Sequence, residues 1–471
     1  MTDKTKPSIP LLMSLVPIAF LIISLFYVIA VLKLDAHIPL ILATSVAAVI
    51  ATIYGIKWNE IRGGIVHGIT LAMGSILILM IVGTMIGTWI LGGIVPSMIY
   101  YGLEILSPKI FLFATLIICS IVSLGTGSSW STAGTVGVAL IGVGRGLGIP
   151  VAMVAGAIIS GSYFGDKMSP LSDTTNLAPA VAGTDIFSHI RHMVYTTAPA
   201  YLIAAVLYLI IGFHTAGGQL DTQNIEMIKS TLNQSYVINP LLLIPPVLVI
   251  IMVIFKIPPL PALFAGTIIG GIFGMLFQSS TLPQVISSAF QGITSSTGVE
   301  TVDNLLTRGG LMSMMNTVAL IMCALSFGGI MEKTGMLETI ALSMLKRVKS
   351  QGSLIATTIF SCISSNIITC DQYMSIVIPG RMYKSAFDAL RLHPKNLSRC
   401  LEDSATLTSS LIPWNSGGAY MHATLGVYPL LYLPYAFLNY ITPMISIFYG
   451  YTGITIVKLD KESTDPGASD E

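Results

Sequence analysis

Charged residues are scarce in this sequence, and their scarcity indicates whether the chain folds in water or in lipid. Only 10% of its 471 residues are charged, whereas 53% are hydrophobic. A soluble domain carries about 25% charged residues. The 23 basic and 22 acidic residues nearly balance, so no excess of positive charge points to a nucleic-acid partner. The composition therefore predicts an all-α protein whose partner is the lipid bilayer.

Cysteines and enzyme motifs are also sparse. The five cysteines are odd in number and show no close pairing, so neither a disulfide framework nor a zinc site is expected. The sequence has no HExxH or GxSG motif and no paired YD and GxGD motifs, and GVGRGLG at 142–148 does not match the dinucleotide-binding fingerprint. We therefore expect neither an intramembrane enzyme nor a bound cofactor.

Long apolar runs are plentiful. A helix needs about 20 residues to cross the hydrocarbon core of a bilayer. The first run is too long for a signal-peptide core and is followed by Lys33 instead of a cleavage site, which predicts a retained span. The sequence predicts a polytopic protein with spans at 12–32, 38–56, 70–93, 190–212, 236–256, 257–278, 310–331 and 427–450.

The two halves of the sequence are similar when one is shifted along the other. Gly93 then falls on Gly335, a displacement of 242 residues, and the polar stretch GTGSSW at 125–130 falls on IITCDQ at 367–372. The break points of the two halves agree in order. We predict a first repeat, a connector, a second repeat and a tail at 1–213, 214–235, 236–455 and 456–471.

Each repeat is predicted to contain a re-entrant hairpin and a broken helix. The apolar arm at 111–124 has only 14 residues before its polar tip, too few to cross the bilayer. At 165–173 a helix is interrupted, because Ser169 precedes a proline and Ser172 suits a helix N-cap. Unwound backbone at membrane depth must be buried in protein or line a wet cavity. The hairpins are expected at 110–145 and 351–390, and the broken helices at 150–182 and 397–425.

The charge distribution predicts the orientation. Each repeat has five full crossings, an odd number, so the second repeat is expected to be inverted relative to the first. With the N-terminus inside, most Lys and Arg residues, Lys256 among them, fall on the cytoplasmic side, and Lys167 lies at a helix break. This bias predicts a bacterial inner-membrane protein with both termini in the cytoplasm. The basic residues expected outside are Lys33, Lys109, Arg145, Lys229 and Arg308.

Four polar clusters are predicted to converge near the midplane, where secondary transporters bind their substrates. All four are rich in oxygen atoms, which suits a hard cation such as sodium and disfavours a transition metal. The hairpin tips contribute Thr126, Ser128, Ser129 and Thr132, and Asn366, Thr369, Asp371 and Gln372. The helix breaks contribute Asp166, Lys167, Ser172, Asp173, Thr174, Thr175 and Asn176, and Thr408, Ser409, Ser410, Asn415 and Ser416.

Carboxylates are the strongest candidates within these clusters. A charged group at the bilayer centre costs about 3 kcal/mol on insertion scales, so such groups are functional candidates. A buried carboxylate can hold a proton or a sodium ion, and this competition predicts exchange of Na⁺ for H⁺ by alternating access. Asp173 and Asp371, in opposite repeats, are the first candidates for the sodium site, and Asp166 is the next.

Structural alternatives remain for several of these residues. Asp166 and Lys167 are adjacent and can form an ion pair that neutralises an unwound turn. Asp173 follows a capping serine and can act only by favouring a helix N-terminus. Glu402 and Asp403 precede the second break by two turns, where they can face the cytoplasm.

Three segments resemble the NhaC family of sodium/proton antiporters: 125–139, 160–179 and 407–421. The resemblance extends from about residue 10 to 455. It implies a homodimer in which a scaffold holds a mobile transport domain, containing both hairpins and both broken helices, that moves like an elevator. Matching motif positions are Asp166, Ser172, Asp173, Thr174, Asn176, Thr408, Trp414, Asn415 and Ser416.

The same family includes exchangers that couple sodium and protons to malate and lactate. These look similar through GTGSSW and YFGDK but tend to show a valine where this chain has Asn176. The difference favours a plain cation exchanger. A substrate carboxylate can also bind the exposed N–H groups at hairpin tips and broken-helix starts, so exchange of an organic acid or amino acid is the alternative.

Overall fold

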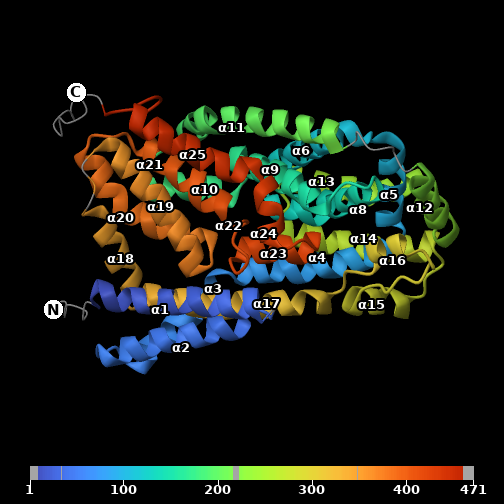
Figure 1. Cartoon of the computed structure of the whole chain (residues 1–471). Coiled ribbons are helices and arrows are strands. Elements are labelled where there is room, and N and C mark those ends of the chain that lie inside the picture. Colours follow the sequence, from blue (N-terminus) through green and yellow to red (C-terminus); the bar gives the residue numbers. More distant parts are fainter. Residues whose placement is uncertain (1–8, 33, 216–221, 347, 349, 460–471) are drawn as a thin grey trace, which may run out of the picture.

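The regular elements of the chain are helices. The computed structural model describes residues 9–32, 34–215, 222–346, 348 and 350–459. Within these ranges, β structure is limited to two isolated bridges, Ile293 with Arg308 and Leu392 with Lys458. The predicted all-α class is therefore confirmed (Figure 1).

The elements up to residue 215 include two π-helical segments, η1 and η2. They are α1 (Leu11–Leu25), η1 (Phe26–Val31), α2 (His37–Ile53), α3 (Trp58–Leu71), α4 (Met73–Leu91), α5 (Ile94–Ile105), α6 (Pro108–Thr126), α7 (Ser129–Thr132), η2 (Ala133–Gly137), α8 (Val138–Gly146), α9 (Val151–Met168), α10 (Asp173–Ala182) and α11 (Ile186–Thr215).

The elements that follow include one π-helical segment, η4, and two short 3₁₀ turns, η3 and η5. They are α12 (Thr222–Ser235), η3 (Pro240–Leu243), α13 (Ile244–Ile254), α14 (Pro259–Phe277), α15 (Leu282–Gln291), α16 (Glu300–Leu306), α17 (Leu311–Lys333), α18 (Met336–Leu345), α19 (Gln351–Thr369), α20 (Gln372–Ala389), α21 (Pro394–Leu401), η4 (Glu402–Thr406), α22 (Leu407–Ser409), α23 (Ser416–Leu425), α24 (Pro429–Tyr432), η5 (Leu433–Tyr435) and α25 (Phe437–Thr452).

Seven helices in the described part of the chain are long and apolar enough to cross a membrane. Five of them, α1, α4, α11, α14 and α17, correspond to predicted spans. The other two, α6 and α19, are the first arms of the two predicted hairpins, and each has 19 residues. The first arm is therefore longer than the 14 residues predicted, because residues 108–110 and the tip residues Gly125 and Thr126 also belong to α6.

Two predicted spans belong to bent helix pairs. The run at 236–256 is part of a pair whose halves meet at 98°, because Pro240 starts a new turn after the Asn239 cap. The run at 427–450 consists of α24 with η5 and α25, which are bent by 61°. Counting each pair as one span gives up to nine crossings among the described residues.

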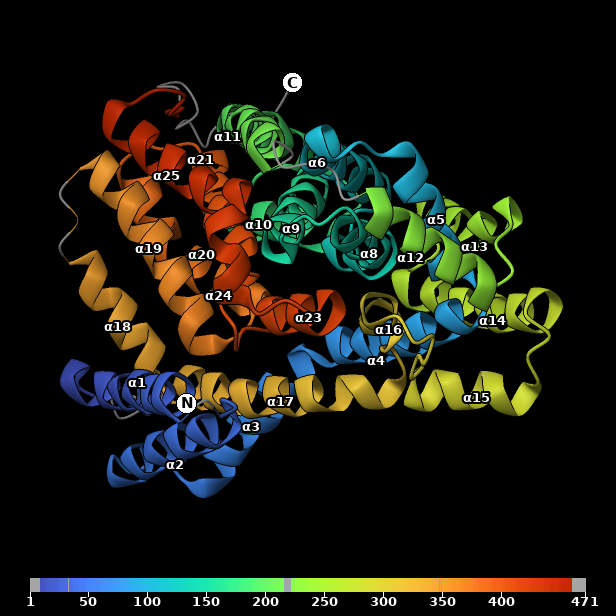
Figure 2. The same ribbon diagram turned by 45° about the vertical axis from the view of Figure 1, so that its right-hand side comes forward.

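The helices form two sides around the centre of the molecule. Figures 1 and 2 show α17 beside α1, α2 and α3 along one side, and α6, α9, α11 and α25 on the opposite side. The first turn of α1 and the last turn of α25 lie at the same end, whereas α5, α12 and α15 lie at the other end. The predicted terminal segments 1–8 and 460–471 and the middle of the connector, 216–221, lie outside the described residues.

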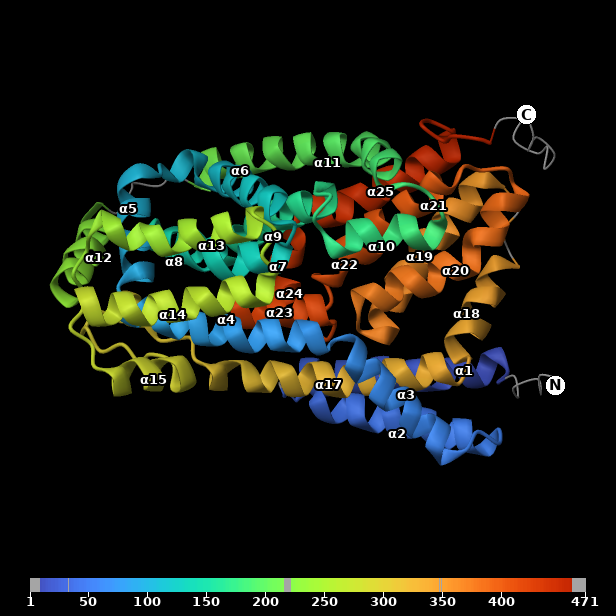
Figure 3. The same cartoon turned by 180° about the vertical axis from the view of Figure 1, so that it is seen from behind.

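Two helical hairpins reach the centre from opposite ends (Figure 3). In the first, α6 and the α7–α8 arm meet at Gly127; in the second, α19 and α20 meet at Cys370. Both turn residues are left-handed, with φ of 66° and 59°. The next residue caps the following helix in each case, Ser128 before α7 and Asp371 before α20.

Other break points of the two halves also share a backbone conformation. Gly93 and Gly335, which the sequence comparison aligns, have φ of 74° and 77° and the same ψ of 6°. Ser172 and Asn415 begin the second parts of the two broken helices, with φ of −74° at both positions. The break points therefore match in geometry as well as in order.

Candidate cation-binding cavity

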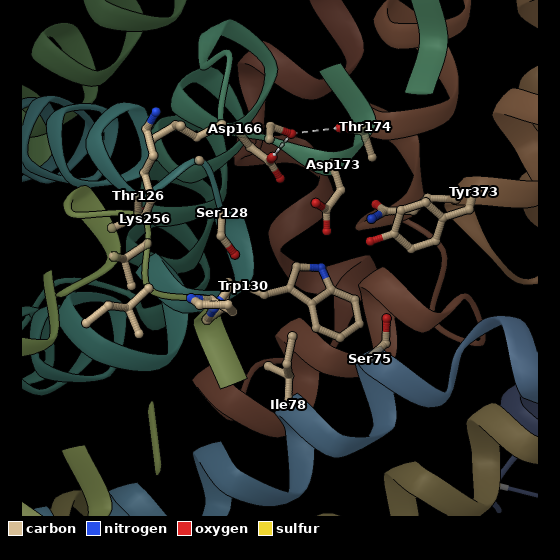
Figure 4. Close-up of a pocket in the computed structure, with 18 residues that line it drawn as sticks. Ser75, Ile78, Thr126, Ser128, Trp130, Asp166, Asp173, Thr174, Lys256 and Tyr373 are labelled. Carbon is tan, nitrogen blue, oxygen red and sulfur yellow. Dashed lines mark hydrogen bonds between the residues drawn. The ribbon is translucent and has the colours of Figure 1, made fainter. Parts of the chain in front are cut away.

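A polar cavity of about 380 Å³ lies where the first hairpin tip, the first helix break and the start of α20 meet (Figure 4). The turn between α13 and α14 and the beginning of α4 complete its wall. The lining residues are Ser75, Ile78, Thr126, Gly127, Ser128, Trp130, Asp166, Leu171, Ser172, Asp173, Thr174, Val253, Lys256, Ile257, Pro258, Pro259, Gln372 and Tyr373.

Asp166 links the hairpin tip to the helix break. It occupies the last turn of the first part of the broken helix, α9, and is only 6% exposed. One carboxylate oxygen accepts hydrogen bonds from the Ser129 hydroxyl at 2.5 Å and the Ser129 N–H at 3.2 Å. The other accepts a bond from the Ser172 hydroxyl at 2.5 Å. Three donors can therefore hold this carboxylate as an anion within the protein.

Asp173 is the second carboxylate of the cavity. It is the first residue of α10, after the Ser172 N-cap, so it also favours the helix N-terminus as the structural alternative proposed. Figure 4 shows its carboxylate pointing toward the rings of Trp130 and Tyr373. The indole Nε1 of Trp130 has no hydrogen-bond partner among the described residues and faces the same carboxylate. Asp173 therefore serves both α10 and the cavity.

The ion pair proposed between Asp166 and Lys167 is wrong. The Lys167 ammonium instead pairs with Asp403, and both side chains are fully buried. Thr196 adds a hydrogen bond to the same Asp403 oxygen at 3.1 Å. Successive residues of a helix point about 100° apart, so Lys167 faces the second broken helix while Asp166 faces the hairpin tip.

Glu402 and Asp403 do not face the cytoplasm. Both lie in η4, are fully buried and contact the first broken helix. Glu402 accepts a hydrogen bond from the Thr174 hydroxyl at 3.0 Å. The contacts Thr174–Glu402 and Lys167–Asp403 therefore join the two broken helices directly.

The second hairpin tip and second break form a separate polar cluster. The Asn366 amide donates to Thr408 Oγ1 at 3.0 Å, and the Asn415 amide donates to Asn366 Oδ1 at 3.1 Å. Asp371 accepts bonds from the N–H groups of Tyr373 and Met374 and from the Ser416 hydroxyl, so its carboxylate caps α20.

The residues of this second cluster are absent from the cavity lining, although Gln372 connects the two regions. The Ser409 hydroxyl donates to Gln372 Oε1 at 3.2 Å, and Gln372 lines the cavity. Thr369 donates to the Ser365 carbonyl oxygen. The structure thus brings together Asp166, Asp173 and their hydroxyl neighbours in one cavity and leaves Asp371 outside it.

Asn176 was expected at the cation site and Lys256 on the cytoplasmic side, and both have other surroundings in the structure. The Asn176 amide donates to the carbonyl oxygens of Pro170 and Ser172 and so closes the unwound turn of the first break. Lys256, assigned to a cytoplasmic loop, lines the cavity and has a left-handed backbone with φ of 65°. A proline-rich stretch follows it at 258–261, and that was the available signal for a sharp turn here.

These features define the class of protein. The chain has several apolar helices long enough to cross a bilayer and a polar cavity lined by two carboxylates, so it is an all-helical, multi-pass membrane protein with a polar site. Comparison with known proteins gives the family. The model of the Na⁺/H⁺ antiporter family matches residues 161–454, and the chain belongs to this family.

Relatives of known name differ in substrate. The chain is 40% identical to the Na⁺/H⁺ antiporter NhaC of Alkalihalophilus pseudofirmus, over 97% of this chain and 98% of that protein. It is 42% identical to the malate-2H⁺/Na⁺-lactate antiporter of Bacillus subtilis, over 88% and 90%. It is 38% identical to the arginine/ornithine antiporter ArcD of Halobacterium salinarum, over 97% and 95%. The resemblance to NhaC is confirmed.

Proposed function

We propose that this chain exchanges Na⁺ for H⁺ across the cytoplasmic membrane by alternating access. The observation that supports this proposal most strongly is the central cavity with its two carboxylates, Asp166 and Asp173. Hydroxyl groups of Ser128, Ser172 and Thr174 line the same cavity. Carboxylate and hydroxyl oxygens suit a hard alkali cation. A proton and a cation compete for the same carboxylate oxygens, and this competition couples the two fluxes.

We propose inverted-topology repeats and an elevator movement as the means of alternating access. The matched conformations at Gly93 and Gly335, and the hairpins that approach from opposite ends, support such repeats. The contacts Thr174–Glu402 and Lys167–Asp403 suit a transport domain in which both broken helices move together. The resemblance to NhaC supports a homodimer, and the distribution of Lys and Arg supports cytoplasmic termini.

Proteoliposomes test this function directly. Purified protein is reconstituted with a pH-sensitive dye in the lumen, and a sodium pulse is added outside. We expect the lumen to acidify as sodium leaves or alkalinise as sodium enters, according to the gradient imposed. Asp166→Asn and Asp173→Asn should each reduce this response at least about 100-fold, since removing one charged partner typically costs several kcal/mol.

The matched control for these variants is Asp388→Asn. Asp388 lies on the exposed end of α20, so the same acid-to-amide change should leave proton movement within twofold of the wild type. A wild-type protein that moves no protons after a sodium pulse contradicts the proposed function. Full activity in Asp166→Asn or Asp173→Asn removes that residue from the cation site.

A second candidate function is exchange of an organic acid or amino acid together with Na⁺ and H⁺. The cavity volume of about 380 Å³ is many times the roughly 30 Å³ that one water molecule occupies, so it exceeds what a single ion needs. Lys256 on its wall provides a positive charge that can pair with a substrate carboxylate. Malate, lactate or arginine in the lumen should then accelerate the sodium-driven signal, and Lys256→Gln should remove that acceleration. Lys384→Gln, at an exposed position near the end of α20, is the control.

A further inference from the structure

A continuous hydrogen-bonded chain joins two buried carboxyl groups in the centre of the molecule. Asp166 Oδ1 contacts the Ser172 hydroxyl at 2.5 Å, and Ser172 Oγ lies 3.1 Å from Thr174 Oγ1. The Thr174 hydroxyl reaches Glu402 Oε1 at 3.0 Å. The chain starts at the cavity and ends at Glu402, whose side chain is fully buried. Two hydroxyl groups therefore form the whole connection between the carboxyls.

The number of hydrogen atoms decides how many protons this chain can hold. Each hydroxyl donates one hydrogen bond. If both carboxyls are ionised, Ser172 donates to Asp166 and Thr174 donates to Glu402, so no hydrogen remains for the contact between the two hydroxyl oxygens. If both are protonated, one hydroxyl hydrogen is left without an acceptor in the chain. A single proton on either carboxyl allows every contact to be a hydrogen bond.

The charges around Glu402 also favour a single proton on the pair of carboxyl groups. Its second oxygen, Oε2, has no hydrogen-bond partner among the described residues, so an isolated anion there is costly. The charged groups that act on it are Lys167 and Asp166 on α9. Asp403 is the next residue in the chain and pairs with Lys167. Lys167 is already paired with Asp403 and offers Glu402 only part of its charge. Asp166 and Glu402 therefore act as two like charges that share one proton.

We propose that Asp166 and Glu402 share a single exchangeable proton through the hydroxyls of Ser172 and Thr174, and that the transported cation binds among the oxygen lone pairs that its departure frees. This inference rests on the proposed function and adds Glu402 as a proton site. In the proton-free state both hydroxyl hydrogens point toward the carboxylates. The lone pairs of Ser172 and Thr174 are then available to a cation beside Asp166.

The proton moves along the chain by three linked transfers. The Asp166 O–H proton passes to Ser172 Oγ, the Ser172 hydroxyl proton passes to Thr174 Oγ1, and the Thr174 hydroxyl proton passes to Glu402 Oε1. Three O–H bonds break and three form, and the net charge of the carboxyl pair stays at −1. Replacing this proton by Na⁺ leaves two carboxylates and one cation, which again sum to −1. The net charge of the site is therefore the same with a proton bound as with Na⁺ bound.

Two variants separate this proposal from a merely structural role for Glu402. Glu402→Gln removes the carboxyl group that shares the proton with Asp166, so this variant should bind Na⁺ with no shared proton to displace. Thr174→Val removes the donor to Glu402 and should trap the proton there. In wild-type protein the apparent Na⁺ affinity should fall about tenfold per pH unit as pH falls, the dependence of one linked proton. In both variants the apparent Na⁺ affinity, measured by ²²Na⁺ binding to the purified protein, should change less than twofold per pH unit. Thr174→Val should also bind Na⁺ more weakly at every pH, because it lacks one of the oxygen atoms that line the cavity.

Conservative variants and a control complete the transport test. Thr174→Ser keeps the hydroxyl and should restore the wild-type pH dependence. Thr442→Val removes a buried hydroxyl that donates to the carbonyl oxygen of Leu438 within α25, and Glu338→Gln removes an exposed carboxylate of α18; both should behave as wild type. A wild-type pH dependence in Glu402→Gln and Thr174→Val overturns the proposal.

Infrared spectroscopy tests the shared proton without transport. Purified wild-type protein at neutral pH should show a protonated-carboxyl C=O band that Na⁺ removes. Glu402→Gln should lack this band, and in Thr174→Val the band should persist with Na⁺ present. A band unchanged by both variants contradicts the shared proton. If wild-type protein in vesicles moves no protons but Glu402→Gln still lacks the band, the result contradicts the proposed function and not the shared proton.

Discussion

The Lys167–Asp403 pair is a fully buried ion pair inside the bundle. Both side chains are fully buried, and the pair connects α9 to η4. Burying an ion pair costs desolvation free energy that the attraction between the charges only about offsets. Its structural value lies in the penalty for breaking it, because one charge then remains buried and alone.

Lys167→Met should therefore lower the free energy of unfolding by about 3–5 kcal/mol. The double variant Lys167→Met/Asp403→Leu removes both charges and should recover most of that loss. Thermal unfolding in detergent measures both. Lys229→Met is the control, because Lys229 lies near Glu104 and Glu226 at the partly exposed α12 and should contribute at most about 1 kcal/mol. If Lys167→Met is as stable as Lys229→Met, the Lys167–Asp403 pair does not have this structural role.

Asp371 offers a test between two roles. Its carboxylate accepts two backbone N–H bonds at the start of α20, and asparagine is an equally good N-cap. We therefore expect Asp371→Asn to keep sodium-driven proton flux within about threefold of the wild type and Asp371→Ala to destabilise the protein by about 1 kcal/mol. Abolished flux in a folded Asp371→Asn protein would instead make Asp371 a cation ligand, as the sequence alone suggested.

The sequence predicts the neighbours of a helix break better than their partners across the fold. Asp166, Ser172, Asp173 and Thr174 lie within nine positions, so any sharp break brings them together. A position facing the cytoplasm was an alternative for Glu402 because its distance from the second break was counted in α-helical turns. It lies in a π-helical segment, where extra residues per turn rotate side chains away from the positions that α-helical periodicity predicts.

At the scale of elements, α6 and α9 pack closely because glycines line their contact. A methyl group on Gly161 would lie 2.5 Å from the carbonyl oxygen of Leu116, and one on Gly165 would lie 2.2 Å from the backbone nitrogen of Leu124. Small residues let backbones approach in the same way in other membrane helices. This contact fixes the hairpin tip against the helix break and therefore positions Ser129 beside Asp166.

Gly161→Ala should separate these helices and destabilise the protein by about 1–3 kcal/mol, as overpacked cores do. Gly63→Ala is the matched control, because a methyl group there meets nothing within 4 Å and helix propensity improves. Melting temperatures in detergent should fall for the first variant and stay level or rise for the second. Equal melting temperatures would show that α6 and α9 are free to move apart.

The sequence predicts which elements exist more reliably than where they bend. Apolar length identified α1, α4, α11, α14 and α17, because a lipid-facing helix needs an uninterrupted apolar surface. The 61° bend was missed because α24, η5 and α25 form one apolar run, 427–450, that no charged residue interrupts. The 98° bend lies where the predicted connector ends and the predicted span at 236–256 begins. The first hairpin arm was predicted too short because the glycine and threonine at 125–126 were taken to end a helix that continues to Thr126 and is capped by Gly127.

At the scale of the whole molecule, the two hairpins differ in the end from which they enter. Their tips share a left-handed turn residue followed by a capping residue, and 243 positions separate Gly127 from Cys370, as they separate Ser128 from Asp371. The inverted repeats proposed above would account for both facts. If the two tips had arisen separately within one bundle, nothing would require the same spacing of 243 positions between both pairs of tip residues.

Cysteine labelling in intact cells tests this opposite orientation. Ser107, at the start of α6, and Ser385, near the end of α20, are both exposed, so Ser107→Cys and Ser385→Cys are matched conservative changes at the two hairpin mouths. Four of the five native cysteines are buried, and the fifth, Cys323, is replaced by Ser to remove background. A membrane-impermeant maleimide should label Ser107→Cys in intact cells and Ser385→Cys only after the membrane is permeabilised. Labelling of both cysteines from the same side would mean that the two hairpins enter the membrane from one face. The fold would then give no support to alternating access.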